Sequence, residues 1–391
     1  MKRIPSLLIA TSALAVVGLA LAAPPAATPP AGSAAPASSP PLGLPPVPVP
    51  ADNPQTPEKI ALGKKLYEDT RFSSTGKVSC ATCHAPEKGF TDNLKTSKGI
   101  NDLTGTRNAP TVLNAAYSTT QFWDGRSPSL EDQAQHPFVN AVEMGLKDHQ
   151  PILDIVRSDK DYVDAFAKVF GKSGPAVTMK EVQQAIAAFE RTVVAGDSPF
   201  DRFYFLGDDK ALNAAQKRGF DVFLNKGRCQ SCHVIEQTTA LFTDNRFHNI
   251  GVGINGVQKD VPTLATEFIK SKFTMEQVDA RVLTDAKSSE LGRLAVTKSF
   301  DDIGSFKTPT LRNVALTAPY MHDGSLKTLK EVVEHYNNGG VTKKTDAVND
   351  FLSGGIRPLN LTPAEIKDLV SFLEALTSPE VAKAAKGKKG K

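Results

Sequence analysis

The chain carries two copies of the pattern C-x-x-C-H, at residues 80–84 and 229–233, and together they use all four of its cysteines. In this pattern the two thiols form thioether bonds with a c-type haem, and the histidine that follows supplies one axial nitrogen to the iron. A zinc site would need four ligands drawn together, whereas the patterns lie 149 residues apart, and a redox dithiol needs no following histidine. The sequence therefore predicts two covalent haems, one bound by Cys80, Cys83 and His84, the other by Cys229, Cys232 and His233.

The first 22 residues have the pattern of a secretory signal, in which Lys2 and Arg3 precede an apolar run that ends in small residues. The run is long for a signal peptide, so an uncleaved membrane anchor is the alternative. Export fits the cysteines, because c-type haem is attached outside the cytoplasm and none is left for a disulfide. We therefore predict a periplasmic protein, tethered to the membrane only if the signal is uncleaved.

The segments that flank the central part of the chain are poor in core-forming residues. Residues 23–56 are rich in Ala, Pro and Ser, which predicts an extended, disordered linker. Residues 381–391 contain five lysines and predict a solvated basic tail. Without these lysines, Lys2 and Arg3, the chain has 39 basic and 42 acidic residues, so its formal net charge of +4 does not indicate nucleic-acid binding. The remaining residues, 57–380, are long enough for two haem domains, 57–205 and 206–380.

The periodic segments favour helices. Residues 57–69 place Ile60, Leu62 and Leu66 at helical spacing. Capping-box patterns begin at Thr178 and at Thr362, and apolar residues follow each at helical spacing. Few segments alternate with a period of two. The sequence predicts a mainly α protein, with long irregular loops around the haems.

An internal repeat joins the two halves of the chain. Residues 110–114, PTVLN, match residues 309–313, PTLRN, at an offset of 199 positions. The same offset pairs Asp124 and Gly125 with Asp323 and Gly324, and a glycine precedes each haem motif, at Gly63 and Gly219. About fifty extra residues lie between the second haem motif and its repeat. We infer two haem domains that arose by duplication.

The repeat also assigns the two haems different roles. The same offset of 199 positions pairs Pro137 with Tyr336. If this position faces the distal side of each haem, Tyr336 can ligate the second iron, whereas Pro137 leaves the first iron with an open site. An open haem binds and activates peroxide or dioxygen, and a six-coordinate haem stores and passes electrons. Met321 and His322 are the competing ligands for the second haem.

In these features, residues 57–380 resemble the bacterial dihaem cytochrome c peroxidase family, including its MauG branch. The family implies two cytochrome c-like domains with a calcium ion and a tryptophan between the haems. The motifs that carry the resemblance, besides the haem sites, are RNAPT at 107–111, FWDGR at 122–126, VEMG at 142–145, PTLRN at 309–313 and YMHDG at 320–324.

The resemblance implies roles for individual residues. Trp123 matches the tryptophan between the haems, and Glu143 matches a distal carboxylate that can move a proton during peroxide cleavage. Gln133 and Pro137 match its distal neighbours, and His322 matches a histidine close to the second haem. The implied calcium ligands are Asn108 and the backbone carbonyls of Thr317 and Pro319.

The chain departs from the commonest family pattern at two positions. Other members place a methionine where this chain has Tyr336, and they carry a distal histidine over the first haem. The first departure favours the MauG branch, and the second favours a first haem that needs no reductive rearrangement. Because the one tryptophan is assigned between the haems, oxidation of a protein partner would have to run through tyrosines.

Three functions follow from these observations. The leading one is reduction of hydrogen peroxide to water at the first haem, with electrons entering through the second haem from a small periplasmic cytochrome c or cupredoxin. The second is MauG-like oxidation of a protein substrate through a high-valent dihaem state. The third is a pure electron-transfer cytochrome, which Glu143 and Pro137 count against because a carrier gains nothing from an open iron.

Overall fold

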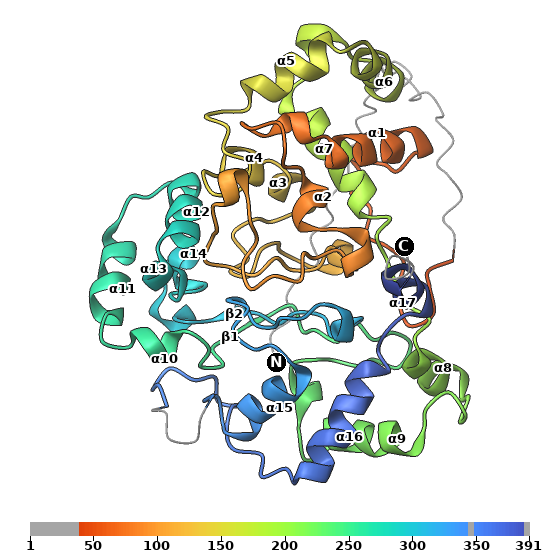
Figure 1. Cartoon of the computed structure of the whole chain (residues 1–391), viewed down its shortest axis with the longest axis vertical. Coiled ribbons are helices and arrows are strands. Elements are labelled where there is room, and N and C mark those ends of the chain that lie inside the picture. Colours follow the sequence, from red (N-terminus) through yellow and green to blue (C-terminus); the bar gives the residue numbers. More distant parts are fainter. Residues whose placement is uncertain (1–38, 343–347, 387–391) are drawn as a thin grey trace, which may run out of the picture. The chain divides into compact units, whose positions relative to one another are not determined.

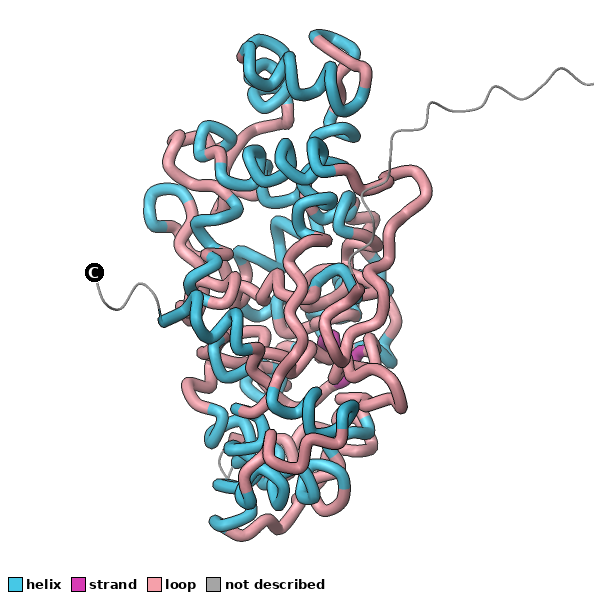
Figure 2. The backbone as a smooth tube through the Cα atoms, turned by 90° about the vertical axis from the view of Figure 1, so that its right-hand side faces the viewer, coloured by secondary structure: helices cyan, strands magenta, loops and turns pink. Residues whose placement is uncertain are grey.

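The computed structural model describes residues 39–342 and 348–386. The predicted signal, residues 1–22, and residues 23–38 of the predicted linker lie outside these ranges. Helices and loops make up nearly all of the described chain, and Figure 2 shows how much of the backbone lies in loops. The prediction of a mainly α fold is confirmed. Within the described ranges, no helix combines the length and the apolar character that a membrane crossing requires.

The elements follow one another along the chain as labelled in Figure 1. Helices of the first half are α1 (Pro57–Glu68), α2 (Cys80–Cys83), α3 (Leu130–Gln133), α4 (His136–Val139), α5 (Gln150–Ser158), α6 (Lys160–Phe170) and α7 (Met179–Glu190). The next helices are α8 (Pro199–Leu206), α9 (Ala214–Leu224), α10 (Ile254–Val257), α11 (Val261–Lys270), α12 (Met275–Thr284), α13 (Ala286–Ser289) and α14 (Leu294–Thr297). The last are α15 (Leu329–Asn337), α16 (Pro363–Glu374) and α17 (Pro379–Lys386). Strands β1 (Phe247–His248) and β2 (Phe306–Lys307) form one short antiparallel pair.

The caps predicted from the sequence are present. Thr178 and Thr362 each accept hydrogen bonds at the start of α7 and α16, and Glu181 and Glu365 complete the two capping boxes. These contacts satisfy backbone N–H groups that the first helical turn leaves without partners. Each cap therefore fixes where its helix begins.

A close helix crossing recurs in each half. Helix α1 packs on α7, and helix α9 packs on α16. At each crossing a glycine faces a backbone carbonyl: a Cβ at Gly63 would clash with the Ala185 carbonyl, and a Cβ at Gly219 would clash with that of Asp368. The glycines before each haem motif are thus required by the close approach of two helices.

Each half has its own hydrophobic core beside a haem motif. The first core includes Leu66, Phe138 and Ile186, and Cys80 packs against it. The second includes Phe223 and Phe372, and Cys229 packs against it. Its members also include Phe200 of α8, so packing groups α8 with the second half, although the predicted boundary at residue 205 placed most of it in the first.

The extra residues of the second half form a third core. Helices α10, α11, α12 and α14 bury a cluster of apolar side chains of their own. Val142, from the first half, packs against this cluster. We refer to residues 254–303 as the inserted segment. It connects the second half with the loop that carries Glu143.

Residues 41–53, which we call the N-terminal strap, are packed, in contrast to the disordered linker expected for residues 23–56. Leu44 is buried, and the Gly43 carbonyl accepts a hydrogen bond from Arg312 Nη2 at 2.8 Å. The Pro45 carbonyl accepts one from the Tyr117 hydroxyl at 2.9 Å, and Asn53 Nδ2 donates to the Gln184 carbonyl at 2.9 Å. The strap is extended, as a proline-rich segment should be, but side chains of both halves bind its carbonyls.

The start of the predicted basic tail is also ordered. Residues 381–386 belong to helix α17, and Val381 packs with Val112 and Leu113 of the first half. An apolar residue on one face therefore docks this helix, while Lys383 and Lys386 lie in its last turn. The remaining tail residues, 387–391, lie outside the described ranges.

Backbone conformation is alike at positions 199 apart. Asn114 and Asn313 have φ of 63° and 62°, and Gly125 and Gly324 have φ of 67° and 62°. Bridges join Gln121 to Ser127 in the first half, and residues 320 and 326 at the same offset in the second. We infer the duplication from this shared geometry together with the sequence repeat.

Candidate functional site

Each haem-motif histidine is held in the tautomer that an iron ligand needs. His84 lies 3.3 Å from the Phe90 carbonyl through Nδ1, and His233 lies 2.9 Å from the Phe242 carbonyl through the same atom. Since a carbonyl only accepts, Nδ1 carries the proton and Nε2 keeps a free lone pair. Burial lowers the pKa of both imidazoles, which favours the neutral form. Both rings are thus prepared to ligate a metal through Nε2.

A cavity of about 570 Å³ surrounds the second motif. Cys229, Cys232 and His233 line it, together with apolar side chains that include Phe223, Leu241, Ile250, Leu329 and Val333. Two thiols, an imidazole with a free Nε2 and apolar walls are the chemistry that holds a c-type haem. The residues therefore fit the predicted group.

All three candidate ligands of the second haem line this cavity, namely Tyr336, Met321 and His322. His322 is already engaged, because its Nε2 lies 2.9 Å from Glu290 Oε2 and its ring stacks on Phe306 at 3.6 Å. Tyr336 extends from α15, and burial raises the pKa of its phenol, as do Cys229 and Cys232. In a dry site of this kind a phenolate forms only with a strong cation beside it, as a ferric iron would be.

Trp123 belongs to the first half but lines the cavity of the second motif. Its indole Nε1 donates to the Asn108 carbonyl at 2.8 Å, and its backbone carbonyl accepts from the Lys307 N–H at 2.8 Å. Both contacts fix the ring within the loop. Trp123 thus brings a loop of the first half to the pocket of the second motif, and its role as an electron relay stays a prediction.

We expect Trp123→Phe to slow electron transfer between the haems, because phenylalanine is much harder to oxidise than indole. The first haem should still react with peroxide, while its re-reduction through the second haem slows in stopped-flow spectra. Trp123→Tyr, which keeps an oxidisable ring, should recover part of the rate. A wild-type rate in Trp123→Phe would leave the tryptophan with a structural role only.

Glu143 lies in the turn at residues 141–144, which follows helix α4 and is close to the first motif. The Pro137 carbonyl accepts a hydrogen bond from the Met144 N–H at 3.2 Å. Burial first, and then the Glu143 carboxyl, raise the pKa of the Cys83 thiol to about 12, which places the carboxyl near the first haem site. Gln133 ends α3 just before this turn. A backbone hydrogen bond thus connects the turn of Glu143 to Pro137 in α4, and Gln133 ends the helix before α4.

Burial also raises the pKa of Glu143 to about 7. Asp279 raises this pKa further, and Arg126 lowers it. A carboxyl with a pKa near the working pH can both accept and return a proton, which is what general acid–base catalysis requires.

The predicted calcium ligands Asn108, Thr317 and Pro319 also line the cavity. Asn108 Nδ2 donates to the Leu94 carbonyl at 2.9 Å, so its Oδ1 is the atom left for a cation. Oxygen donors of this kind suit calcium. The calcium site stays a prediction.

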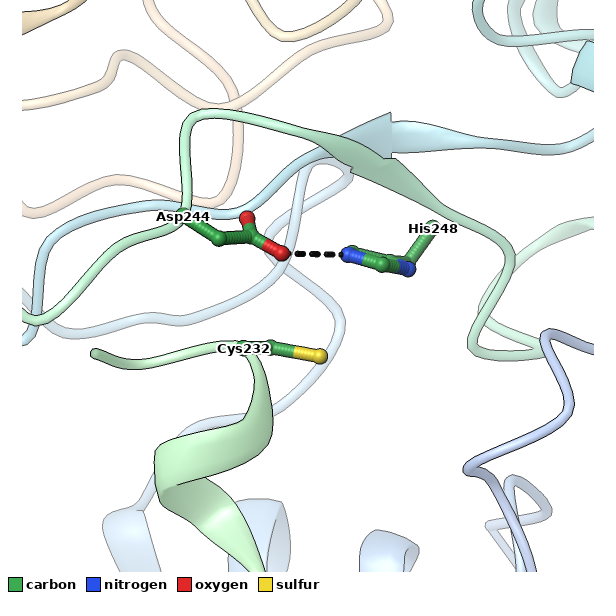
Figure 3. A group of neighbouring side chains, drawn as sticks. All are labelled: Cys232, Asp244 and His248. Carbon is green, nitrogen blue, oxygen red and sulfur yellow. Dashed lines mark hydrogen bonds and ion pairs between the residues drawn. The ribbon is translucent and has the colours of Figure 1, made fainter.

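Two residues beside the second motif, Asp244 and His248, were not among the predicted site residues. Ligand atoms of Cys232, Asp244 and His248 lie within 4.8 Å of one another (Figure 3). His248 Nε2 lies 2.8 Å from Asp244 Oδ2, and hydrogen bonds with Cys232 and Asp244 raise the pKa of His248 to about 9. A thioether at Cys232 would consume its thiol, so we assign the group to the haem pocket. The i, i+4 spacing of Asp244 and His248 was the available signal.

Lys307 is a second residue that sequence patterns did not indicate. It lines the cavity, and its Nζ donates to the Thr120 carbonyl at 2.6 Å. Burial lowers the pKa of this ammonium to about 8. A cation beside a haem pocket can pair with a haem propionate. No local sequence pattern indicates this role for Lys307.

A profile of the family described as di-haem cytochrome c peroxidase matches residues 57–210. Cytochrome-c peroxidase IdrP1 of Denitromonas iodatirespirans is 40% identical over 341 residues, covering 85% of each chain. Methylamine utilization protein MauG of Methylorubrum extorquens is 37% identical over 335 residues, covering 86% of this chain and 82% of its own. The chain therefore belongs to the di-haem cytochrome c peroxidase family, which makes it an oxidoreductase with two haems.

Solved structures agree with this assignment. A MauG-like protein associated with microbial copper homeostasis is 31% identical, with a TM-score of 0.70 over 89% of this chain and 98% of that one. The diheme peroxidase BthA of Burkholderia thailandensis, at 24% identity and a TM-score of 0.65 over 84% of this chain and 87% of its own, shares the fold.

Proposed function

We propose that the protein is a periplasmic peroxidase. It reduces hydrogen peroxide to two molecules of water with two electrons and two protons. The peroxide reacts at the first haem, in domain 57–205. Electrons enter through the second haem, in domain 206–380, from a small cytochrome c or cupredoxin.

The observation that carries this proposal is the difference between the two distal positions. Tyr336 lines the cavity of the second motif, whereas the first half has Pro137 at the corresponding position and Glu143 in the turn that hydrogen-bonds to the Pro137 carbonyl. A proline side chain cannot ligate iron. The second half is therefore suited to electron transfer, and the first leaves its iron without a ligand from position 137, near a proton-transferring carboxyl.

The haems, when bound, supply the redox chemistry, and the protein's own groups prepare it. His84 and His233 present Nε2 as neutral imidazoles because their Nδ1 protons are held by carbonyls. Glu143 accepts a proton from one oxygen of peroxide and delivers it to the other, which leaves as water. Trp123 is fixed by its indole hydrogen bond where electrons must pass between the halves.

MauG-like oxidation of a protein substrate is the second candidate. Tyr336 at the second-motif cavity favours it, and relatives named MauG are among those that match most of the chain. A route to a protein partner would need oxidisable residues near the surface. Tyr204, which is 40% exposed, is one such residue.

The test is steady-state consumption of peroxide by the purified holoprotein with reduced cytochrome c. We expect two haems per chain in a pyridine haemochrome assay, and oxidation of two cytochromes per peroxide. One haem per chain would contradict the dihaem assignment. A protein with both haems but no cytochrome oxidation, tested also with a reduced cupredoxin, would contradict the peroxidase proposal and leave the MauG-like reaction.

A further inference from the structure

The inserted segment reaches across to the turn that carries Glu143. Asp279, on α12, is buried between two residues of the first half. Its Oδ1 accepts a hydrogen bond from Arg126 Nε at 2.6 Å, and its Oδ2 accepts one from Asn140 Nδ2 at 2.9 Å. The Asp279 carboxylate, in the second half of the chain, thus binds Arg126 and Asn140 of the first half. Asn140 directly precedes the turn that carries Glu143.

Asn140 organises this turn. Its side-chain oxygen accepts from the Val142 N–H at 3.0 Å, and its carbonyl accepts from the N–H groups of Glu143 at 3.2 Å and Gly145 at 2.8 Å. Because Asp279 holds the Asn140 amide, it fixes which atom of that amide faces Val142. The position of Glu143 therefore depends on a residue of the inserted segment.

Asp279 and Arg126 are also the charged groups that act on the Glu143 carboxyl. Arg126 is shared between Asp279 and Asp124, whose Oδ1 lies 3.0 Å from Arg126 Nη1. On the neighbouring segment, the Ile100 N–H donates to the Glu143 carbonyl, and the nearby charges of Lys98 and Asp102 pair with each other at the surface. On the α2 side lies the Cys83 thiol, which a thioether would consume.

We propose that Asp279 is a positioning residue for Glu143, which it places through Asn140 and whose proton it helps to retain. The inference rests on the proposed function, in which Glu143 transfers a proton. The charges around Glu143 agree with a role for Asp279 in retaining the proton, because Asp279 raises the pKa of Glu143 while Arg126 lowers it. A negative charge at 279 thus offsets the positive charge at 126.

The test is an infrared pH titration of the resting holoprotein. The protonated Glu143 carboxyl gives a C=O stretching band that is identified by its loss in Glu143→Gln. In Asp279→Asn this band should disappear at lower pH than in the wild type, because the ionised form is no longer opposed by a neighbouring anion. Asp279→Ser also removes the charge and leaves room for a water beside Asn140, so it should give the same shift in the titration midpoint. It is the variant to measure if Asp279→Asn does not fold.

Ser289→Ala is the matched control. Ser289 also belongs to the inserted segment, and its Oγ accepts from Arg107 Nε at 2.8 Å, but it carries no charge. Its titration midpoint should equal that of the wild type. An unchanged midpoint in the Asp279 variants, with both haems attached, would overturn the proposal. A shifted midpoint in a protein without peroxide turnover would support the coupling and overturn the proposed function, so the two failures are distinguishable.

Discussion

Glu143→Gln is expected to slow peroxide turnover by about a hundredfold to ten-thousandfold, the usual contribution of a general acid–base group. Glutamine has nearly the same size, so both haems should remain attached. It cannot accept a proton and return it, which the cleavage of peroxide requires. The measurement is the second-order rate constant at limiting peroxide.

The best comparison for this variant is Glu190→Gln. Glu190 is also buried, burial raises its pKa to about 8, and it is close enough to Cys80 to raise the pKa of that thiol. It is therefore a second carboxyl near the first haem motif with a raised pKa. We expect its replacement to leave peroxide turnover unchanged. Equal losses in the two variants, or none in Glu143→Gln, would remove Glu143 from the proton-transfer step.

The ionisation of Glu143 should also make the rate constant for peroxide depend on pH. Burial first, and then Asp279, raise the pKa of Glu143 to about 7, so its base form is lost as the pH falls through that value. The rate constant for peroxide should therefore fall below about pH 7 in the wild type. In Glu143→Gln this dependence should be absent. A flat wild-type profile would contradict the assignment.

Tyr336→Phe should convert the second haem from low spin to high spin in the ferric protein. A phenolate oxygen favours ferric iron, so its loss should also raise the reduction potential of that haem. The measurements are the electron paramagnetic resonance spectrum of the oxidised protein and a spectroelectrochemical titration. In the wild type we expect one low-spin and one high-spin haem.

Tyr320→Phe is the control for this substitution. Tyr320 lines the same cavity, but its hydroxyl donates to the Val314 carbonyl at 3.1 Å. Removing that hydroxyl should leave both spin states as they are. An unchanged low-spin signal in Tyr336→Phe would assign the ligand elsewhere, and Met321 would be the next residue to replace.

Local chemistry made part of this structure predictable. The capping boxes at Thr178 and Thr362 begin α7 and α16 because a side chain and the first helical N–H groups lie within one turn of chain. The haem motifs are equally local. Tyr336 could be connected to the second motif only because the repeat provided a reference in the first half.

Contacts between distant segments were not predictable in this way. Asp279 lies 153 positions from Arg126 and has no sequence pattern that points to it. The N-terminal strap was misjudged for a related reason. Its composition predicts an extended chain, which it has, but a proline-rich segment still offers carbonyl acceptors. Whether donors such as Arg312 and Arg191 reach them depends on the folded surface.

The strap has a consequence for the order in which the chain is assembled. Gly43 and Arg312 are 269 positions apart, and Arg312 also binds Asp201 within the second half. The contact between Gly43 and Arg312 therefore cannot form until most of the chain has been synthesised, whereas the strap partners Tyr117 and Gln184 come earlier in the chain. Because the entropic cost of loop closure grows with the length of the loop, we expect the Gly43–Arg312 contact to form after the others. Limited proteolysis within residues 41–53 should consequently report whether the second half has finished folding.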